Sequence, residues 1–139
     1  MEAKAFLQQI KKLDKMIENK MAEAQRWKEI ATNTSPSMMG ERVQSSGNPH
    51  KIADAIGRYI DLEREINQDI DKLVDAKKAV ISVIEQLNAT EYDVLHKIYV
   101  QGFTFDEVAI ACKHTTSWAT TVHGRALKHV QNILDRKKD

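Results

Sequence analysis

The chain has 139 residues, which is enough for one ordinary domain or two very small ones. Its 21 Lys and Arg residues nearly balance 20 Asp and Glu residues, so charge of one sign does not cover the molecule. The low content of Gly, Pro and aromatic residues argues against an all-β sandwich and a fully disordered chain, and the single Cys112 excludes an internal disulfide. Because no apolar run could cross a membrane or act as a signal peptide, we expect a cytoplasmic, all-α protein with no membrane partner.

A long amphipathic helix is predicted over residues 3–31. Apolar residues recur there in steps of three and four, Lys20 is the one break, and neither Pro nor Gly interrupts the pattern. Pro36 disfavours helical geometry at the residue before it, so the helix should end near Thr32. Residues 32–50 hold both prolines and a Ser/Asn-rich run, and we expect them to form a mobile linker.

A second long helix is predicted from about Lys51 to Leu87. Ile56, Ile70 and Ile84 widen its apolar stripe, which favours more than one partner helix. The acidic residues of this helix, Asp69 among them, are expected on a solvated face. The simplest fold for residues 1–89 is a long, coiled-coil-like antiparallel hairpin, and the alternative is a homo-oligomer formed through the long helices.

Residues 90–139 show the pattern of a helix-turn-helix domain. Thr90 is expected to cap a first helix, and Gly102 is its natural C-cap. Thr104 and Glu107 form a capping box at the start of a short helix. The next turn is predicted at residues 113–114, and the last helix should begin with Thr115 or Thr116 and run to about residue 134.

The last helix carries a candidate DNA-binding face. If Ala119 points toward the core, a step of 100° per residue turns a small, hydroxyl-rich face outward, edged by Trp118 and Arg125. Such a face suits the major groove of double-stranded DNA. The alternative is a plain helical hairpin with solvated threonines, but Thr and Ser are poor helix formers. The candidate residues are Thr115, Thr116, Ser117, Trp118, Thr120, Thr121, Gly124, Arg125 and Lys128.

The charge pattern agrees with this interpretation. Residues 113–139 hold six basic and two acidic residues, whereas residues 90–112 hold one basic and four acidic residues. A basic segment of this kind points to a polyanionic partner. A solvated, lysine-rich helix end explains the charge alone equally well.

Residues 90–134 resemble region 4 of sigma-70-type factors, which reads promoter elements. The residues that carry the resemblance are Gly102, Thr104, Glu107, Val108, Ala109, Lys113, Thr115, Arg125, Ala126 and Lys128. The whole chain is similar to small phage and prophage transcriptional regulators of Gram-positive bacteria, which end as this chain does at residues 122–127. The resemblance implies promoter binding and contact with RNA polymerase in the bacterial host cell. His114 and Ala119 depart from the pattern, since branched apolar residues are common at both places.

Two further functional classes stay open. A small terminase subunit also joins a helix-turn-helix to long helices but would assemble as a ring, and an interaction protein could use the same unit to bind polymerase instead of DNA. Nothing in residues 1–89 resembles a promoter-melting region, so an accessory regulator is favoured over a complete sigma factor. We expect no enzyme, metal site or cofactor, since no P-loop, dinucleotide-binding or catalytic-triad spacing is present and Cys112 with His114 makes only two ligands.

Overall fold

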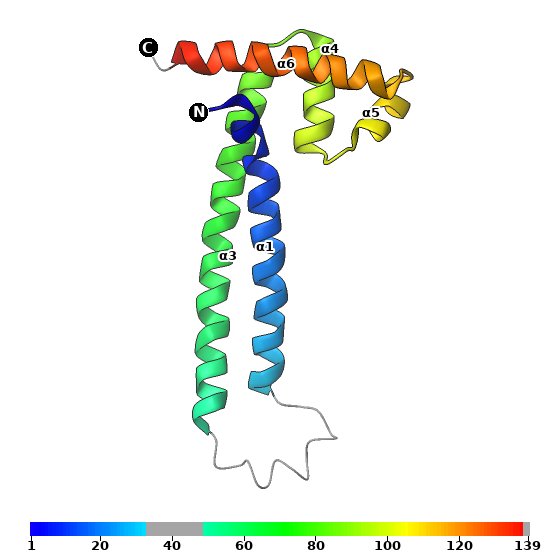
Figure 1. Ribbon diagram of the computed structural model, residues 1–139. Helices are drawn as coiled ribbons and strands as arrows, with labels where there is room; N and C mark the ends of the chain where they lie inside the picture. The colour runs from blue at the N-terminus through cyan, green and yellow to red at the C-terminus, as the bar shows by residue number, and fades with distance from the viewer. Residues whose placement is uncertain (33–48, 138–139) are drawn as a thin grey trace. The chain divides into compact units, whose positions relative to one another are not determined.

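The computed structural model describes residues 1–32 and 49–137, which are helical almost throughout (Figure 1). The all-α class predicted from the sequence is confirmed, and the described residues contain no strand. The elements in chain order are α1 (Ala3–Thr32), α3 (Pro49–Ile84), α4 (Ala89–Leu95), the π-helix η2 (His96–Val100), α5 (Phe105–Cys112) and α6 (Thr116–Lys137).

The chain divides into two compact units. One consists of residues 15–71, and the other consists of residues 1–14 together with the chain from Lys72 onward. Both α1 and α3 contribute residues to each unit. No helix within residues 1–32 and 49–137 is both long and apolar enough to cross a lipid bilayer.

The linker predicted over residues 32–50 lies outside the described residues except at its ends. Thr32 still belongs to α1, and α3 begins at Pro49, two residues earlier than expected. Proline is favoured in the first turn of a helix because its missing N–H would have no partner there.

Within residues 15–71, α1 and α3 lie side by side and run in opposite directions (Figure 1). Their contact buries Ile17 and Ala24 from α1 and Ala55 and Leu62 from α3. These are small or branched residues at helical spacing, so one stripe of each helix is removed from water.

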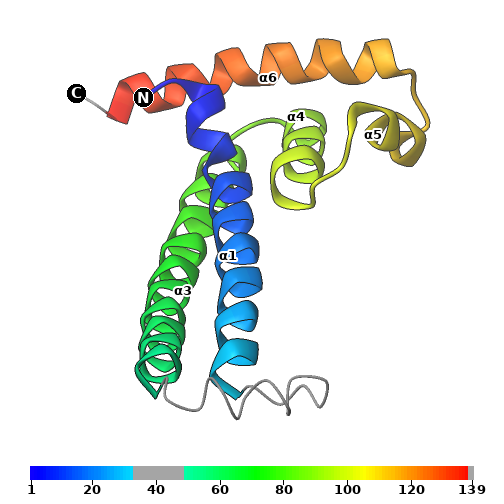
Figure 2. The same ribbon diagram turned by 60° about the horizontal axis from the view of Figure 1, so that its bottom comes forward.

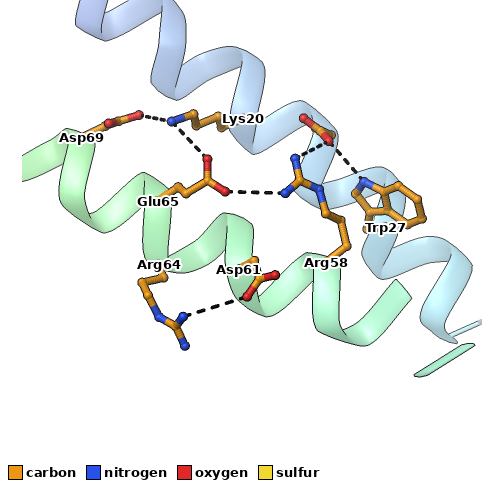
Figure 3. A network of polar contacts seen from close by, with 8 residues as sticks. Lys20, Trp27, Arg58, Asp61, Arg64, Glu65 and Asp69 are labelled. Carbon is orange, nitrogen blue, oxygen red and sulfur yellow. Dashed lines mark hydrogen bonds and ion pairs between the residues drawn. The ribbon is translucent and has the colours of Figure 1, made fainter. Parts of the chain in front are cut away.

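A polar network crosses this contact and corrects the prediction for Asp69 (Figure 3). Asp69 is only 3% exposed, and its Oδ2 accepts a hydrogen bond of 2.7 Å from Lys20 Nζ. Lys20, which broke the apolar stripe in the sequence, therefore has a partner on the opposite helix. That hydrogen bond raises the pKa of Lys20 above its usual value. Glu65 forms ion pairs with the same amine at 3.4 Å and with Arg58 at 3.5 Å.

The wide apolar stripe of α3 is only partly covered. Ile84 is buried, but Ile56 and Ile70 stay 45% and 40% exposed, and Ile66 is half-buried. The expected second partner helix for Ile56 and Ile70 is not found among the described residues.

The other unit has two hydrophobic clusters. The larger cluster joins the start of α1, the end of α3, α4 and α6, and the smaller cluster joins α4, α5 and α6. Both α4 and α5 pack against α6 (Figure 2). The fully buried members include Leu7, Ile10, Val80, Val83, Ile84, Leu95, Ala126 and Val130 in the larger cluster and Val94, Val108, Ala119 and Val122 in the smaller one.

The connection from α3 to α4 differs from the prediction in two details. The helix ends at Ile84 and not at Leu87, because the amides of Gln86 and Leu87 bond to carbonyls three residues back and tighten the last turn. The N-cap of α4 is Asn88 and not Thr90. Its side-chain oxygen accepts a hydrogen bond of 2.9 Å from the Glu91 amide, and Asn is as good a cap as Thr.

The turn before α5 forms as the sequence predicts. After η2 the chain reverses at Gly102, which has a φ of 81° that favours glycine. Thr104 and Glu107 then form both hydrogen bonds of a capping box, at 3.1 Å and 2.9 Å. The π-helix η2 was not predicted, since its apolar residues continue the spacing of α4 without a break.

Candidate nucleic-acid interface

The candidate face begins at the turn between α5 and α6. Lys113 ends α5 in the left-handed conformation, with a φ of 59°. The Thr115 hydroxyl then accepts a hydrogen bond of 3.0 Å from the Trp118 amide, so Thr115 caps α6 and Thr116 is its first residue. These two local features fix the start and the rotational phase of α6.

That phase turns the predicted residues away from the core. Ala119, Val122 and Ala126 are buried on the inner side of α6. Trp118 is half-buried and packs on the smaller cluster. The remaining candidates are all exposed, namely Thr115, Thr116, Ser117, Thr120, Thr121, Gly124, Arg125 and Lys128.

Several hydroxyl groups of this face are engaged within the protein. Thr116 Oγ1 donates to Asp106 Oδ1 at 2.7 Å, and Thr120 Oγ1 donates to the Ser117 carbonyl at 2.9 Å. The Asp106 carboxylate also places negative charge beside the first turn of α6, which disfavours a DNA phosphate at that place. The hydroxyls of Ser117 and Thr121 form no hydrogen bond among the described residues, and both residues are exposed to solvent.

A stacked ring pair lies at the same end of α6. The rings of His114 and Trp118 have centroids 3.9 Å apart and planes within 10° of each other. His114 is exposed. The sequence pattern showed His114 only as a departure from an apolar position, because the turn that brings it over Trp118 is not periodic. The pair forms a flat, partly apolar surface beside Ser117.

Arg125 is held by a buried carboxylate that the sequence analysis missed. Glu91 of α4 is 1% exposed, and its Oε2 accepts a hydrogen bond of 3.0 Å from Arg125 Nε. Its Oε1 is 2.7 Å from His129 Nδ1. Burial pushes the pKa of Glu91 upward, but the hydrogen bonds and charges of His129 and Arg125 lower it below its usual value overall. Arg125 therefore sits on the exposed side of α6 with a fixed orientation and with part of its charge offset.

His123 lies within the basic segment of residues 113–139, but its side chain belongs to the packing. It is half-buried, its Nε2 is 2.6 Å from the Tyr99 hydroxyl, and Phe105 meets its ring edge-on. Burial lowers the pKa of His123, and burial raises the pKa of Tyr99 to about 12. Both side chains are therefore neutral near pH 7, and His123 adds no charge to the candidate face.

Cys112 lies in the packing between α5 and α4. Its Sγ donates to Asp93 Oδ2 at 3.5 Å, and burial raises the pKa of the thiol. Among residues 1–32 and 49–137 there is no group of three or more His, Cys, Asp and Glu side chains that could hold a metal ion.

Comparison with known proteins finds no match for this chain among family models, curated proteins or solved structures. The likeness of residues 90–134 to sigma region 4 thus remains a prediction that rests on the quoted residues.

Proposed function

We propose that this protein binds double-stranded DNA through the exposed side of α6 and acts as a phage-type transcriptional regulator. The observation that carries the proposal is the division of α6 into two sides. Its inner side buries Ala119, Val122 and Ala126. Its outer side presents the free hydroxyls of Ser117 and Thr121 and the small Gly124, with the exposed Arg125 and Lys128 beside them. A rigid helix of this kind is what a major groove accepts.

The same proposal assigns α5 and α6 to a helix-turn-helix with α6 as the recognition helix. Three local features support this assignment because they define where the helices begin and end. The capping box starts α5, the left-handed Lys113 ends it, and Thr115 caps the start of α6. The preceding residues 1–89 form the helical hairpin of the proposal, supported by the opposed directions of α1 and α3 within residues 15–71. Contact with RNA polymerase at promoters belongs to the proposal as well, because the resemblance implies it.

DNA binding should weaken steeply with salt. Lys128, Arg136 and Lys137 offer three cations along α6, and Arg125 adds less because Glu91 offsets part of its charge. About three to four phosphate contacts give a log–log slope of Kd against salt of roughly 3 in magnitude. Fluorescence anisotropy measures the slope, on a site first selected from random double-stranded DNA. Lys128→Ala should reduce the slope by about 1, and the control Lys72→Ala on α3 should leave it unchanged. A slope near zero would show that this protein does not bind DNA through contacts to the phosphates.

Substitutions at Gly124 test whether the exposed side of α6 contacts DNA. A Cβ added there would meet no atom within 4 Å, so Gly124→Ala should stabilise α6 by about 1 kcal/mol. If α6 lies close to DNA, the same substitution should weaken binding, and Gly124→Leu should weaken it more without unfolding the protein. Thermal melting and anisotropy check the two effects.

Gly57 on α3 provides the matched control for this test. It is a mid-helix glycine whose added Cβ also meets no atom within 4 Å. Gly57→Ala should raise the melting temperature in the same way and leave DNA affinity unchanged. Wild-type affinity for the Gly124→Leu variant would show that this side of α6 is not the interface.

The polymerase part of the proposal has its own experiment. Purified host RNA polymerase should be retained by the immobilised protein and should be retained more strongly when promoter DNA is added. Retention without any DNA affinity would favour the interaction protein over the DNA-binding regulator.

A further inference from the structure

An apolar face of α3 has no partner among residues 15–32 and 49–71, the described part of this unit. Ile52, Ile56, Ile60 and Ile70 are 39%, 45%, 48% and 40% exposed. At 100° per residue these four side chains fall within an 80° sector of the helix. Ala55, Leu62 and Asp69, which face α1, lie in a different sector. Four branched aliphatic side chains on one side of a single helix form an interaction surface.

The face has the spacing of a coiled-coil seam. Ile56, Ile60, Glu63, Asn67 and Ile70 follow one another in steps of four and three, the pattern by which one helix packs along another. Glu63 and Asn67 occupy the middle of the seam, and isoleucines precede and follow them along the helix. The pattern is therefore the same from either direction, which suits two copies that run antiparallel.

We propose that this face binds a second copy of the chain, α3 against antiparallel α3, with Ile60 opposite Ile70 of the second copy. In this register Glu63 lies opposite Asn67 of the second copy, whose side-chain amide can donate to the carboxylate. A shift by one heptad would place Ile60 against Glu63 or Asn67 against Ile70. A parallel pairing would place Glu63 against Glu63. Polar residues in a seam select register and direction in this way.

Charges at the edge of the seam agree with the same register. Arg64 and Asp71 are seven residues apart on one edge, so Arg64 of one copy lies about 7.5 Å along the axis from Asp71 of the other. Side chains of a helix lean toward its N-terminus, and in an antiparallel pair this brings these two toward each other. The two-fold symmetry makes two such pairs.

Arg64 and Asp71 are both available for ion pairs with the second copy. Arg64 has only a 3.9 Å contact with Asp61, and both side chains are more than half exposed. Asp71 is exposed and forms no ion pair with any of the described residues. Because both copies use the same face, the association closes at two and does not extend into a ring.

Sedimentation equilibrium on the full chain tests the proposal without DNA. The 15.9 kDa chain should reach twice its mass as concentration rises. Arg64→Asp and Asp71→Arg should each raise the dimer Kd about tenfold, because each places like charges at both edges. The double variant Arg64→Asp/Asp71→Arg should return the Kd to the wild-type value. Asp54→Arg makes the same charge reversal on another side of α3 and should have no effect.

Ile60→Glu gives a second, independent test. It places a carboxylate against Ile70 of the second copy twice and should raise the dimer Kd roughly 100-fold. Ile60 is 48% exposed, so circular dichroism should show unchanged helix content. A wild-type chain that stays monomeric, a trimer or larger assembly, or a double variant that fails to recover would each overturn the proposal. A wild-type monomer that binds DNA with the predicted salt dependence would overturn this inference and leave the proposed function intact.

Discussion

Replacing Glu91 by alanine should lower the free energy of unfolding by about 2–3 kcal/mol. The carboxylate is 1% exposed and accepts from both Arg125 and His129, and hydrogen bonds to charged groups contribute the most among side-chain hydrogen bonds. The substitution also leaves a cavity between α4 and α6. Urea denaturation followed by circular dichroism measures the loss. Glu85→Ala, at an exposed residue just after α3, is the control and should change stability by less than about 0.5 kcal/mol.

The stability of the folded protein should also depend on pH through the ionisation of Glu91. The pKa of Glu91 in the folded protein lies below its ordinary value of 4.5, so folding favours the ionised form. The stability contributed by Glu91 is therefore fully present above pH 4.5 and is lost as the pH falls through the lowered pKa. Wild type should lose more stability than Glu91→Ala between pH 6 and pH 3. Parallel pH profiles for the two proteins would show that Glu91 is not held ionised.

DNA affinity should respond to Glu91 through Arg125. Without its acceptor, Arg125 keeps its charge but loses its fixed orientation. We expect Glu91→Gln, which retains one acceptor oxygen, to weaken specific binding more than nonspecific binding. A purely structural role would weaken both by the same factor, so affinity for the selected site and for random DNA distinguishes the two.

Features that depend on one segment could be predicted from the sequence. The helical phase of α6 follows from the spacing of Ala119, Val122 and Ala126, and it gave the correct exposure for the predicted face. The capping box at Thr104 and the chain reversal at Gly102 depend on a few neighbouring residues and were also predicted correctly.

Features that depend on contacts between two segments could not be predicted from the sequence. Asp69 and Lys20 are ordinary charged residues in their own helices, and only the pairing of α1 with α3 makes Asp69 buried. Glu91 is an unremarkable residue of a first helical turn until α6 packs over it. Asp106 reaches Thr116 only because of the turn between α5 and α6, which removes that hydroxyl from the predicted interface.

The pairing of α1 with α3 should depend on Lys20 and Asp69 in a non-additive way. Lys20→Met leaves the Asp69 carboxylate buried without its 2.7 Å donor, and such an uncompensated charge is strongly destabilising. We expect a drop in melting temperature of roughly 5–10 °C, since 1 kcal/mol shifts a chain of this size by a few degrees. Lys15→Met removes an exposed pair with Glu18 on the same helix and should shift the melting temperature little.

The double variant Lys20→Met/Asp69→Leu should recover most of that loss. Replacing both members of a buried ion pair by apolar side chains of similar size removes the desolvation cost together with the attraction. Glu65 still keeps Arg58 as a partner at 3.5 Å in this variant (Figure 3). Thermal melting of the four proteins gives the coupling between the two sites. If the double variant loses as much as the two single variants together, Lys20 and Asp69 do not act as a pair, and the register of α1 on α3 rests on the apolar contacts of Ile17, Leu62 and their neighbours alone.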